Sequence, residues 1–182
     1  MKIYEYDPRK LPPAYLKAIG AVTAAFAQTE SLAQALLAGC LGLDAEYGMA
    51  VTTHMTAPLR DGVLRAVAEI RFEVADLDEL DDILDRFQVA VDKRNAIAHR
   101  GWCQDESTGQ VFTIKTSARG SVQTSLIEMS VDQVESDAAL IYEVGMDFMR
   151  FMVLRDLYPR LPPPRPRGHK SKAARKAARK KK

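Results

Sequence analysis

The sequence has 182 residues, of which 47% are apolar and 27% are charged. This length and composition predict one globular domain with a substantial hydrophobic core. The chain begins without the apolar stretch of a secretory signal, and no apolar run approaches the roughly 20 residues of a membrane helix, so we expect a cytoplasmic protein with no membrane partner. Cys40 and Cys103 lie far apart without metal-like spacing and are expected to be reduced thiols.

The net charge of +2 hides a strong asymmetry. Residues 160–182 hold 11 of the 26 basic residues and no acidic one, which leaves 15 basic against 24 acidic residues in 1–159, a net charge of −9. The body therefore shows no sign of a basic face that would hold a nucleic acid duplex. The tail is able to attract RNA, DNA or an acidic partner; alternatively, it only solvates the chain or folds back on the acidic body.

Two helices are predicted in the first 74 residues. The first covers about 14–38 and is free of proline, and Gly39 and Gly42 end it as a glycine stop does. Residues 43–56 are expected to be a connector, and a second helix covers about 58–74. The apolar stripe of the first helix comprises Ile19, Val22, Phe26, Thr29, Ala33, Leu36 and Leu37. The stripe assigned to the second comprises Leu59, Val63, Val67, Ile70 and Arg71.

The third helix is predicted to run from an N-cap at Asp76 to His99. Glu79 follows Asp76 at the spacing of a capping box. Acidic residues crowd the first turns, where the helix dipole favours negative charge, so they do not require a metal site. The apolar residues that share one face are Leu80, Ile83, Leu84, Phe87 and Val91. The same spacing then reaches Arg94 and Asn95, where a core residue is expected, and His99 follows one turn later.

The period changes after Gly101. Residues 101–105, 110–115 and 121–127 are short β-prone runs separated by turn signals, which predict a hairpin or three-stranded flap over about 101–129. A last long helix is expected from Ser130 or Asp132 to about Tyr158. Its apolar face comprises Val134, Ala138, Ile141, Val144, Phe148, Met152 and Leu157.

These elements predict a mainly α fold. We expect an up-and-down bundle of four to five helices over residues 1–158, with the small β flap inserted before the last long helix. Residues 159–182 are Pro-rich and then Lys/Arg-rich, and we expect a disordered tail there.

The third predicted helix closes with Asp92-Lys93-Arg94-Asn95-Ala96-Ile97-Ala98-His99-Arg100-Gly101. An arginine with an adjacent asparagine and a histidine after four residues, at the end of a long helix, resembles the signature of the HEPN superfamily. That signature is an arginine, often followed by Asn, Asp or His, and then a histidine after four to six residues. The resemblance covers about residues 14–157, and the flap and the basic tail would be additions to the minimal bundle.

The resemblance implies a metal-independent ribonuclease that acts as a homodimer, with the Arg/His elements of two protomers in one composite cleft. His99 would be the general acid/base, Arg94 would bind the scissile phosphate, and Asn95 would orient the phosphate or the histidine. These residue types suit attack by the RNA 2′-hydroxyl, because an imidazole exchanges protons near neutral pH and a guanidinium matches developing negative charge. No cofactor is implied. The basic residues expected to contact nucleic acid are Lys93, Arg100, Lys170, Lys172, Arg175, Lys176, Arg179 and Lys180.

Helix geometry gives a separate argument for a dimer. Arg94 and His99 are five residues apart, which places them roughly 140° apart around an ideal helix. One protomer is therefore not expected to aim both groups at one atom. A second copy related by symmetry would supply the missing group.

Each residue also has a structural interpretation. Arg94 would be a buried arginine paired with Glu30 or another carboxylate, Asn95 would cap backbone groups, and His99 would be held by the helix dipole. Trp102 is expected to pack against the helices rather than to stack on a base. These interpretations do not exclude a phosphate role for the same side chains.

Two functions stay open. The first is an RNA endonuclease acting as a toxin or a phage-defence effector, with an antitoxin or another regulatory protein as a partner. The second is a non-catalytic HEPN-like dimer that binds RNA, a nucleotide or a partner protein. The acidic body favours the second function because it repels RNA. The intact set of Arg94, Asn95 and His99 favours the first.

Overall fold

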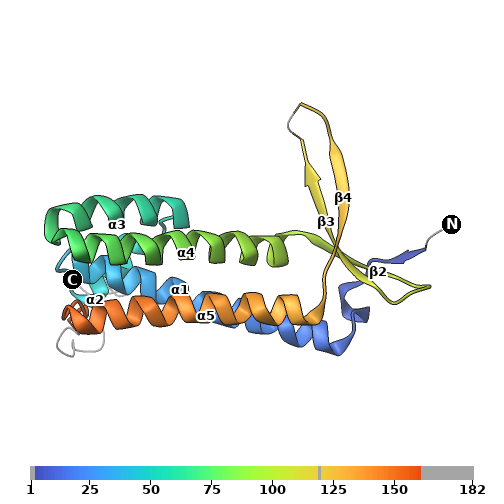
Figure 1. Ribbon diagram of the computed structural model, residues 1–182, viewed down its shortest axis with the longest axis horizontal. Helices are drawn as coiled ribbons and strands as arrows, with labels where there is room; N and C mark the ends of the chain where they lie inside the picture. Colours follow the sequence, from blue (N-terminus) through green and yellow to red (C-terminus); the bar gives the residue numbers. More distant parts are fainter. Residues whose placement is uncertain (1–2, 119, 161–182) are drawn as a thin grey trace, which may run out of the picture.

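The computed structural model describes residues 3–118 and 120–160 and is mainly helical, with one small antiparallel sheet at one end (Figure 1). The helices are α1 (Pro13–Cys40), α2 (Ala45–Thr52), α3 (Ala57–Arg71), α4 (Val74–His99) and α5 (Val131–Leu154), and a 3-10 turn, η1 (Pro8–Lys10), precedes α1. The strands are β1 (Tyr4–Glu5), β2 (Gly101–Asp105), β3 (Val111–Ser117) and β4 (Gln123–Glu128).

The three long helices α1, α4 and α5 lie side by side and enclose the core (Figure 1). The apolar stripes predicted for these helices are buried, with Ile19 only partly covered, so their burial is confirmed. α1 packs most extensively on α5, and the two helices approach closely where Thr29 donates to the Ile141 carbonyl at 2.8 Å. Gly145 allows this approach, because a Cβ there would lie 2.6 Å from the Thr29 hydroxyl.

The end of α1 follows the predicted glycine stop. Gly42 adopts a φ of 66°, which a residue with a side chain rarely takes, and the Leu43 amide donates back to the Ala38 carbonyl at 2.9 Å. The predicted connector after it contains a helix, α2, so that prediction was wrong. α2 packs back along α1 through Gly48, whose missing side chain admits Ala38. α2 was missed because its eight residues mix small, apolar and polar types, so that the apolar residues show no clear helical spacing.

Two helix ends differ from the prediction. The N-cap of α4 is Glu73 and not Asp76, and its side chain makes no cap hydrogen bond. Asp76 lies in the first turn instead, where it accepts from Arg155 at 2.5 Å, because tertiary ion pairing competes with local capping. α5 begins after Ser130, whose hydroxyl accepts from the Gln133 amide, but it ends at Leu154 rather than near Tyr158.

The buried face of α3 also differs from the predicted stripe. Arg60, Leu64 and Ala68 face the core, whereas Leu59 and Ile70 are 54% and 89% exposed. The predicted stripe was rotated around the helix: it included Arg71, which is exposed, and left out Arg60, while its Val63 and Val67 are partly buried against the core. The buried set has the regular i, i+4, i+8 spacing of a helix face, with Arg60 as its first member.

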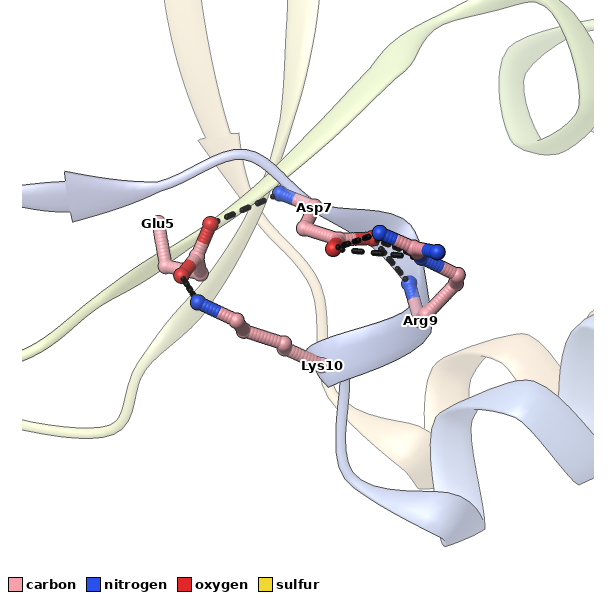
Figure 2. A network of polar contacts seen from close by, with 4 residues as sticks. All are labelled: Glu5, Asp7, Arg9 and Lys10. Carbon is pink, nitrogen blue, oxygen red and sulfur yellow. Dashed lines mark hydrogen bonds and ion pairs between the residues drawn. The ribbon is translucent and has the colours of Figure 1, made fainter.

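The sheet has the order β1-β2-β3-β4, with antiparallel neighbours throughout. The flap was predicted as β2, β3 and β4, which the structure confirms, but β1 was missed because two residues carry no period. Tyr4 pairs with Asp105 across the edge of β2. Figure 2 shows how η1 is tied to this strand: Lys10 of η1 contacts Glu5 of β1, while Arg9 donates to Asp7 within the turn and its N-cap. These hydrogen bonds lower the pKa of both carboxyl groups.

Within the described ranges, no helix has the length and apolar character needed to cross a membrane. The predicted tail lies beyond Arg160, outside the residues that the structure describes, apart from its first two positions. There the Arg160 carbonyl accepts from the Ala45 amide at 3.0 Å, which ties the end of the described chain to the start of α2.

Candidate functional site

The C-terminal end of α4 carries the Arg/Asn/His set. The helix ends because Arg100 is extended, with φ −86° and ψ 148°, and leads into β2. The last carbonyls of a helix have no partner within it. Trp102 meets this need, since its indole nitrogen donates to the Ile97 carbonyl at 3.0 Å. The start of the sheet is thereby fastened to the helix end beside His99.

Trp102 packs on the helices, as predicted. It is half-buried against the core and meets the ring of Tyr15 edge to face, with centroids 6.3 Å apart. The hydroxyl of Tyr15 donates to the Met129 carbonyl at 2.8 Å, and burial raises its pKa. The sheet is thus joined to α1 as well as to α4, which fixes its position relative to the end of α4.

Arg94 links the three polar residues within one chain. Its Nη1 lies 2.7 Å from Nε2 of His99 and 3.1 Å from Oδ1 of Asn95. A guanidinium only donates hydrogen bonds, so Nε2 of His99 is the acceptor in this contact. The arrangement therefore presents an imidazole nitrogen beside a cation at an exposed helix end.

This contact corrects the helical-wheel argument for a dimer. The backbone positions of Arg94 and His99 differ in angle, but a long arginine stem bridges the gap. One protomer aims both groups at a common point, so the geometry of the helix does not require a second copy. A homodimer stays a prediction that rests on the resemblance.

An aromatic floor supports Arg94. Its guanidinium carbon lies 5.0 Å from the ring centroid of Phe26 on α1. The Phe26 ring stacks parallel to Phe87, and Phe87 meets Phe148 edge to face, with centroids 6.4 and 5.3 Å apart. Such a cation–π contact contributes about 0.5–1 kcal/mol near a surface and favours one orientation of the guanidinium. Phe26 was predicted as a core residue, but which helix it faces depends on tertiary packing.

The site lies at the end of α4 that α3 does not run beside. α3 has 15 residues and α4 has 26, lengths of about 22 and 39 Å. α3 therefore runs beside only the N-terminal part of α4 (Figure 1). At the other end of α4, Asn95 and His99 are exposed and Arg94 is half-exposed. The three groups are accessible to a ligand.

Glu30 does not support Arg94. It forms an ion pair with Arg60, whose Nη1 lies 3.3 Å from Oε1 of Glu30. Arg60 is 1% exposed and also donates to the Met55 carbonyl at 3.0 Å. The buried, carboxylate-paired arginine proposed for position 94 therefore exists at position 60. The reason is that Arg60 lies on the face of α3 that packs on the core, whereas Arg94 lies near the end of α4 that α3 does not run beside.

The basic residues predicted to contact nucleic acid are only partly described. Lys93 forms an ion pair with Asp137 of α5 at 2.5 Å, and Gln133 donates to the same carboxylate oxygen. Lys93 thus has a structural contact that the prediction missed. Arg100 is half-exposed at the end of α4. The remaining six lie outside the described residues: Lys170, Lys172, Arg175, Lys176, Arg179 and Lys180.

Metal-ligating side chains do not gather in the described part of the chain, where no group of three or more His, Cys, Asp and Glu residues is placed to hold an ion. The acidic residues at the start of α4 pair with arginines instead: Arg65 contacts Asp81 and Asp85, and Arg155 contacts Glu79. These ion pairs join α3 and α5 to α4.

Comparisons with protein-family models, with curated proteins and with solved structures found no match to this chain. The residues at the end of α4 and their geometry are therefore the features of this chain that point to a function.

Proposed function

We propose that this protein is a metal-independent RNA endonuclease of the HEPN type. The observation that carries the proposal is the contact of Arg94 with both His99 and Asn95 at an exposed helix end. An imidazole beside a guanidinium is a suitable pair for phosphodiester transesterification, which needs a proton acceptor and a group that stabilises negative charge.

The reaction uses the nucleophile that RNA carries. His99 accepts the proton of the 2′-hydroxyl, the oxygen attacks the adjacent phosphorus, and the bond to the 5′-oxygen breaks. A proton returns from an imidazolium to that leaving oxygen, which yields a 2′,3′-cyclic phosphate and a 5′-hydroxyl end. Arg94 turns from His99 to the phosphate and stabilises the dianionic transition state, while Asn95 holds the guanidinium or the phosphate.

The proposed active form is a homodimer in the cytoplasm. Successive helices reverse direction along the chain, which supports an up-and-down bundle over the described body. The end of α4 that α3 leaves uncovered is the surface through which a second copy would bring its own Arg94 and His99. One histidine would then act as the base and the other as the acid. We further propose that this enzyme acts as a toxin or a phage-defence effector and that an antitoxin or another regulatory protein inhibits it.

The test is cleavage of single-stranded RNA in the presence of EDTA. We expect the wild type to cleave, and we expect His99→Ala and Arg94→Ala each to lose at least about 100-fold of the rate. The product ends should carry a cyclic phosphate. His54, an exposed histidine beyond α2, provides a matched control, and His54→Ala should cleave as the wild type does.

Equal rates of RNA cleavage by the wild type and by His99→Ala would refute the proposed endonuclease activity. Sedimentation at several concentrations tests the homodimer separately, since a monomer at the concentration where cleavage is measured would refute the composite cleft.

The second candidate, a non-catalytic dimer that binds RNA, a nucleotide or a partner protein, is favoured by the charge of the body. Residues 1–159 carry a net −9, which repels RNA except near basic segments. In that case the tail supplies most of the affinity. Deletion of residues 161–182 should weaken RNA binding and flatten its dependence on salt, because fewer counterions are released. An unchanged salt slope would exclude a polyanion role for the tail.

A further inference from the structure

The outer half of the β3–β4 hairpin projects away from the helices (Figure 1). Its side chains are exposed from Lys115 to Ser117 on β3 and from Gln123 to Leu126 on β4. A two-stranded ribbon without an apolar cover is at best marginally stable by itself. This part of the hairpin therefore adds little to the core, and its conspicuous feature is the surface it presents.

One face of this hairpin continues from the candidate site. Residues paired across antiparallel strands share a face, and alternate residues along a strand return to it. Trp102 pairs with Thr113, and Thr113 pairs with Ile127, so all three share the face that Trp102 packs against the helices. Two residues further out, Lys115 pairs with Ser125 on the same face.

The next pair on that face is Ser117 with Gln123. The described outer part of this face thus consists of an ammonium, two hydroxyls and an amide, and it contains no large apolar side chain. A hollow of about 450 Å³ lies against it, lined by Lys115, Ser117, Gln123, Thr124 and Ser125.

The charge of this segment differs from that of the body. Residues 107–127 contain two basic residues and no acidic one, whereas residues 1–159 as a whole have nine more acidic than basic residues. The hairpin is therefore a break in a surface that otherwise repels a polyanion. Short donors and a lysine suit phosphate oxygens rather than an apolar protein partner.

We propose that this face of the β3–β4 hairpin binds the phosphate backbone of single-stranded RNA. The inference rests on the proposed function, because the RNA it holds is the strand that enters the site at His99. Trp102, three residues after His99, joins the site to the hairpin, so a strand bound at His99 continues outward along Lys115 and Ser117. A single strand is favoured over a duplex, because the acidic body offers no broad basic face that would hold a duplex.

The experiment measures the affinity of the full chain for a labelled 20-nucleotide single-stranded RNA. All variants carry His99→Ala, so that the RNA stays intact and binding is measured whether or not the wild type cleaves. Ser117→Glu places a negative charge on the proposed face. Thr116→Glu is the matched control, because Thr116 is the neighbouring exposed residue and points to the opposite face.

We expect Ser117→Glu to weaken binding roughly three- to tenfold more than Thr116→Glu at physiological salt, where charges are screened within about 8 Å. Lys115→Ala should lower the slope of log affinity against log salt by about 0.7, the loss of one phosphate contact. Thr116→Ala should leave that slope unchanged.

Equal affinities for the two glutamate variants, together with an unchanged slope for Lys115→Ala, would overturn the proposed binding face even if the wild type cleaves RNA. The converse result would be face-specific RNA binding by a protein whose wild type does not cleave RNA. It would support the proposed binding face and refute only the proposed endonuclease activity.

Discussion

Two arginines, Arg60 of α3 and Arg94 of α4, contact α1 only one turn apart, at Glu30 and Phe26, yet they have opposite surroundings. Arg60 lies on the buried face of α3 and is held by Glu30 and the Met55 carbonyl. Arg94 lies beyond the reach of α3, rests on Phe26 and contacts an exposed histidine. The difference shows that the point where α3 begins separates a structural arginine, carried on its buried face, from an arginine that is accessible to a ligand.

The largest effect on stability is expected from Arg60→Ala. It removes a buried ion pair, a hydrogen bond to a carbonyl and the packing of a long side chain, so we expect a loss of about 3 kcal/mol in the free energy of unfolding. Chemical unfolding followed by circular dichroism measures it. Arg65→Ala on the same helix is the control, because its partially exposed ion pairs should contribute less than about 1 kcal/mol. Equal losses would contradict the distinction between a buried and a partly exposed arginine on this helix.

Arg94→Ala should show the reverse pattern. The free energy of unfolding should fall by less than about 1 kcal/mol, since a partly exposed cation–π contact and exposed hydrogen bonds are lost. The same variant loses cleavage by at least about 100-fold. A loss of stability as large as that of Arg60→Ala would show that Arg94 is structural as well.

Phe26→Leu tests whether the aromatic ring beneath Arg94 positions its guanidinium. We expect a loss of about 1.5 kcal/mol in stability from the smaller side chain, and a fall in cleavage rate because Arg94 is no longer held over a ring. Phe151→Leu is the matched control at the other end, where Arg155 lies 3.8 Å from the Phe151 centroid. It should cost similar stability but leave cleavage unchanged. Equal effects on cleavage would refute a positioning role for Phe26.

The smallest effect concerns Cys40, at the covered end of α1. Burial raises the pKa of its thiol to about 11 from an ordinary value of 9.0. Between these values the unfolded chain releases the proton and the folded chain retains it, so stability falls as the pH rises from 9 to 11. We expect the free energy of unfolding to be about 1 kcal/mol lower at pH 10 than at pH 8, as measured by chemical unfolding at the two pH values. A Cys40→Ala variant with the same pH dependence would contradict this assignment.

Much of the helical body was predictable because its signals are periodic. The stripes of α1, α4 and α5 identified buried residues correctly, and Gly42 marked the end of α1. The stripe of α3 was predicted only in part: Val63 and Val67 pack against the core, but the buried face begins with Arg60, and burial of a charge depends on a partner thirty residues away. α2 and β1 were missed because short elements are stabilised by neighbours rather than by their own pattern.

The site shows the same limit. The sequence identified Arg94, Asn95 and His99 as a group, because the spacing of the helix placed polar residues on an apolar face. It did not predict that Arg94 contacts His99 in the same chain, since a wheel describes backbone angles and not the reach of a side chain. The ion pair of Lys93 with Asp137 was likewise beyond reach, because it joins residues 44 positions apart.

The parallel packing of α1 on α5 has a consequence for synthesis. The first long helix leaves the ribosome with its apolar stripe uncovered, and its main partner follows more than a hundred residues later. β1 likewise waits for β2 before its hydrogen bonds can form. The core therefore cannot form until α5 has been synthesised. A ribosome that stalls before residue 131 would release a polypeptide with an exposed apolar surface that is prone to aggregate.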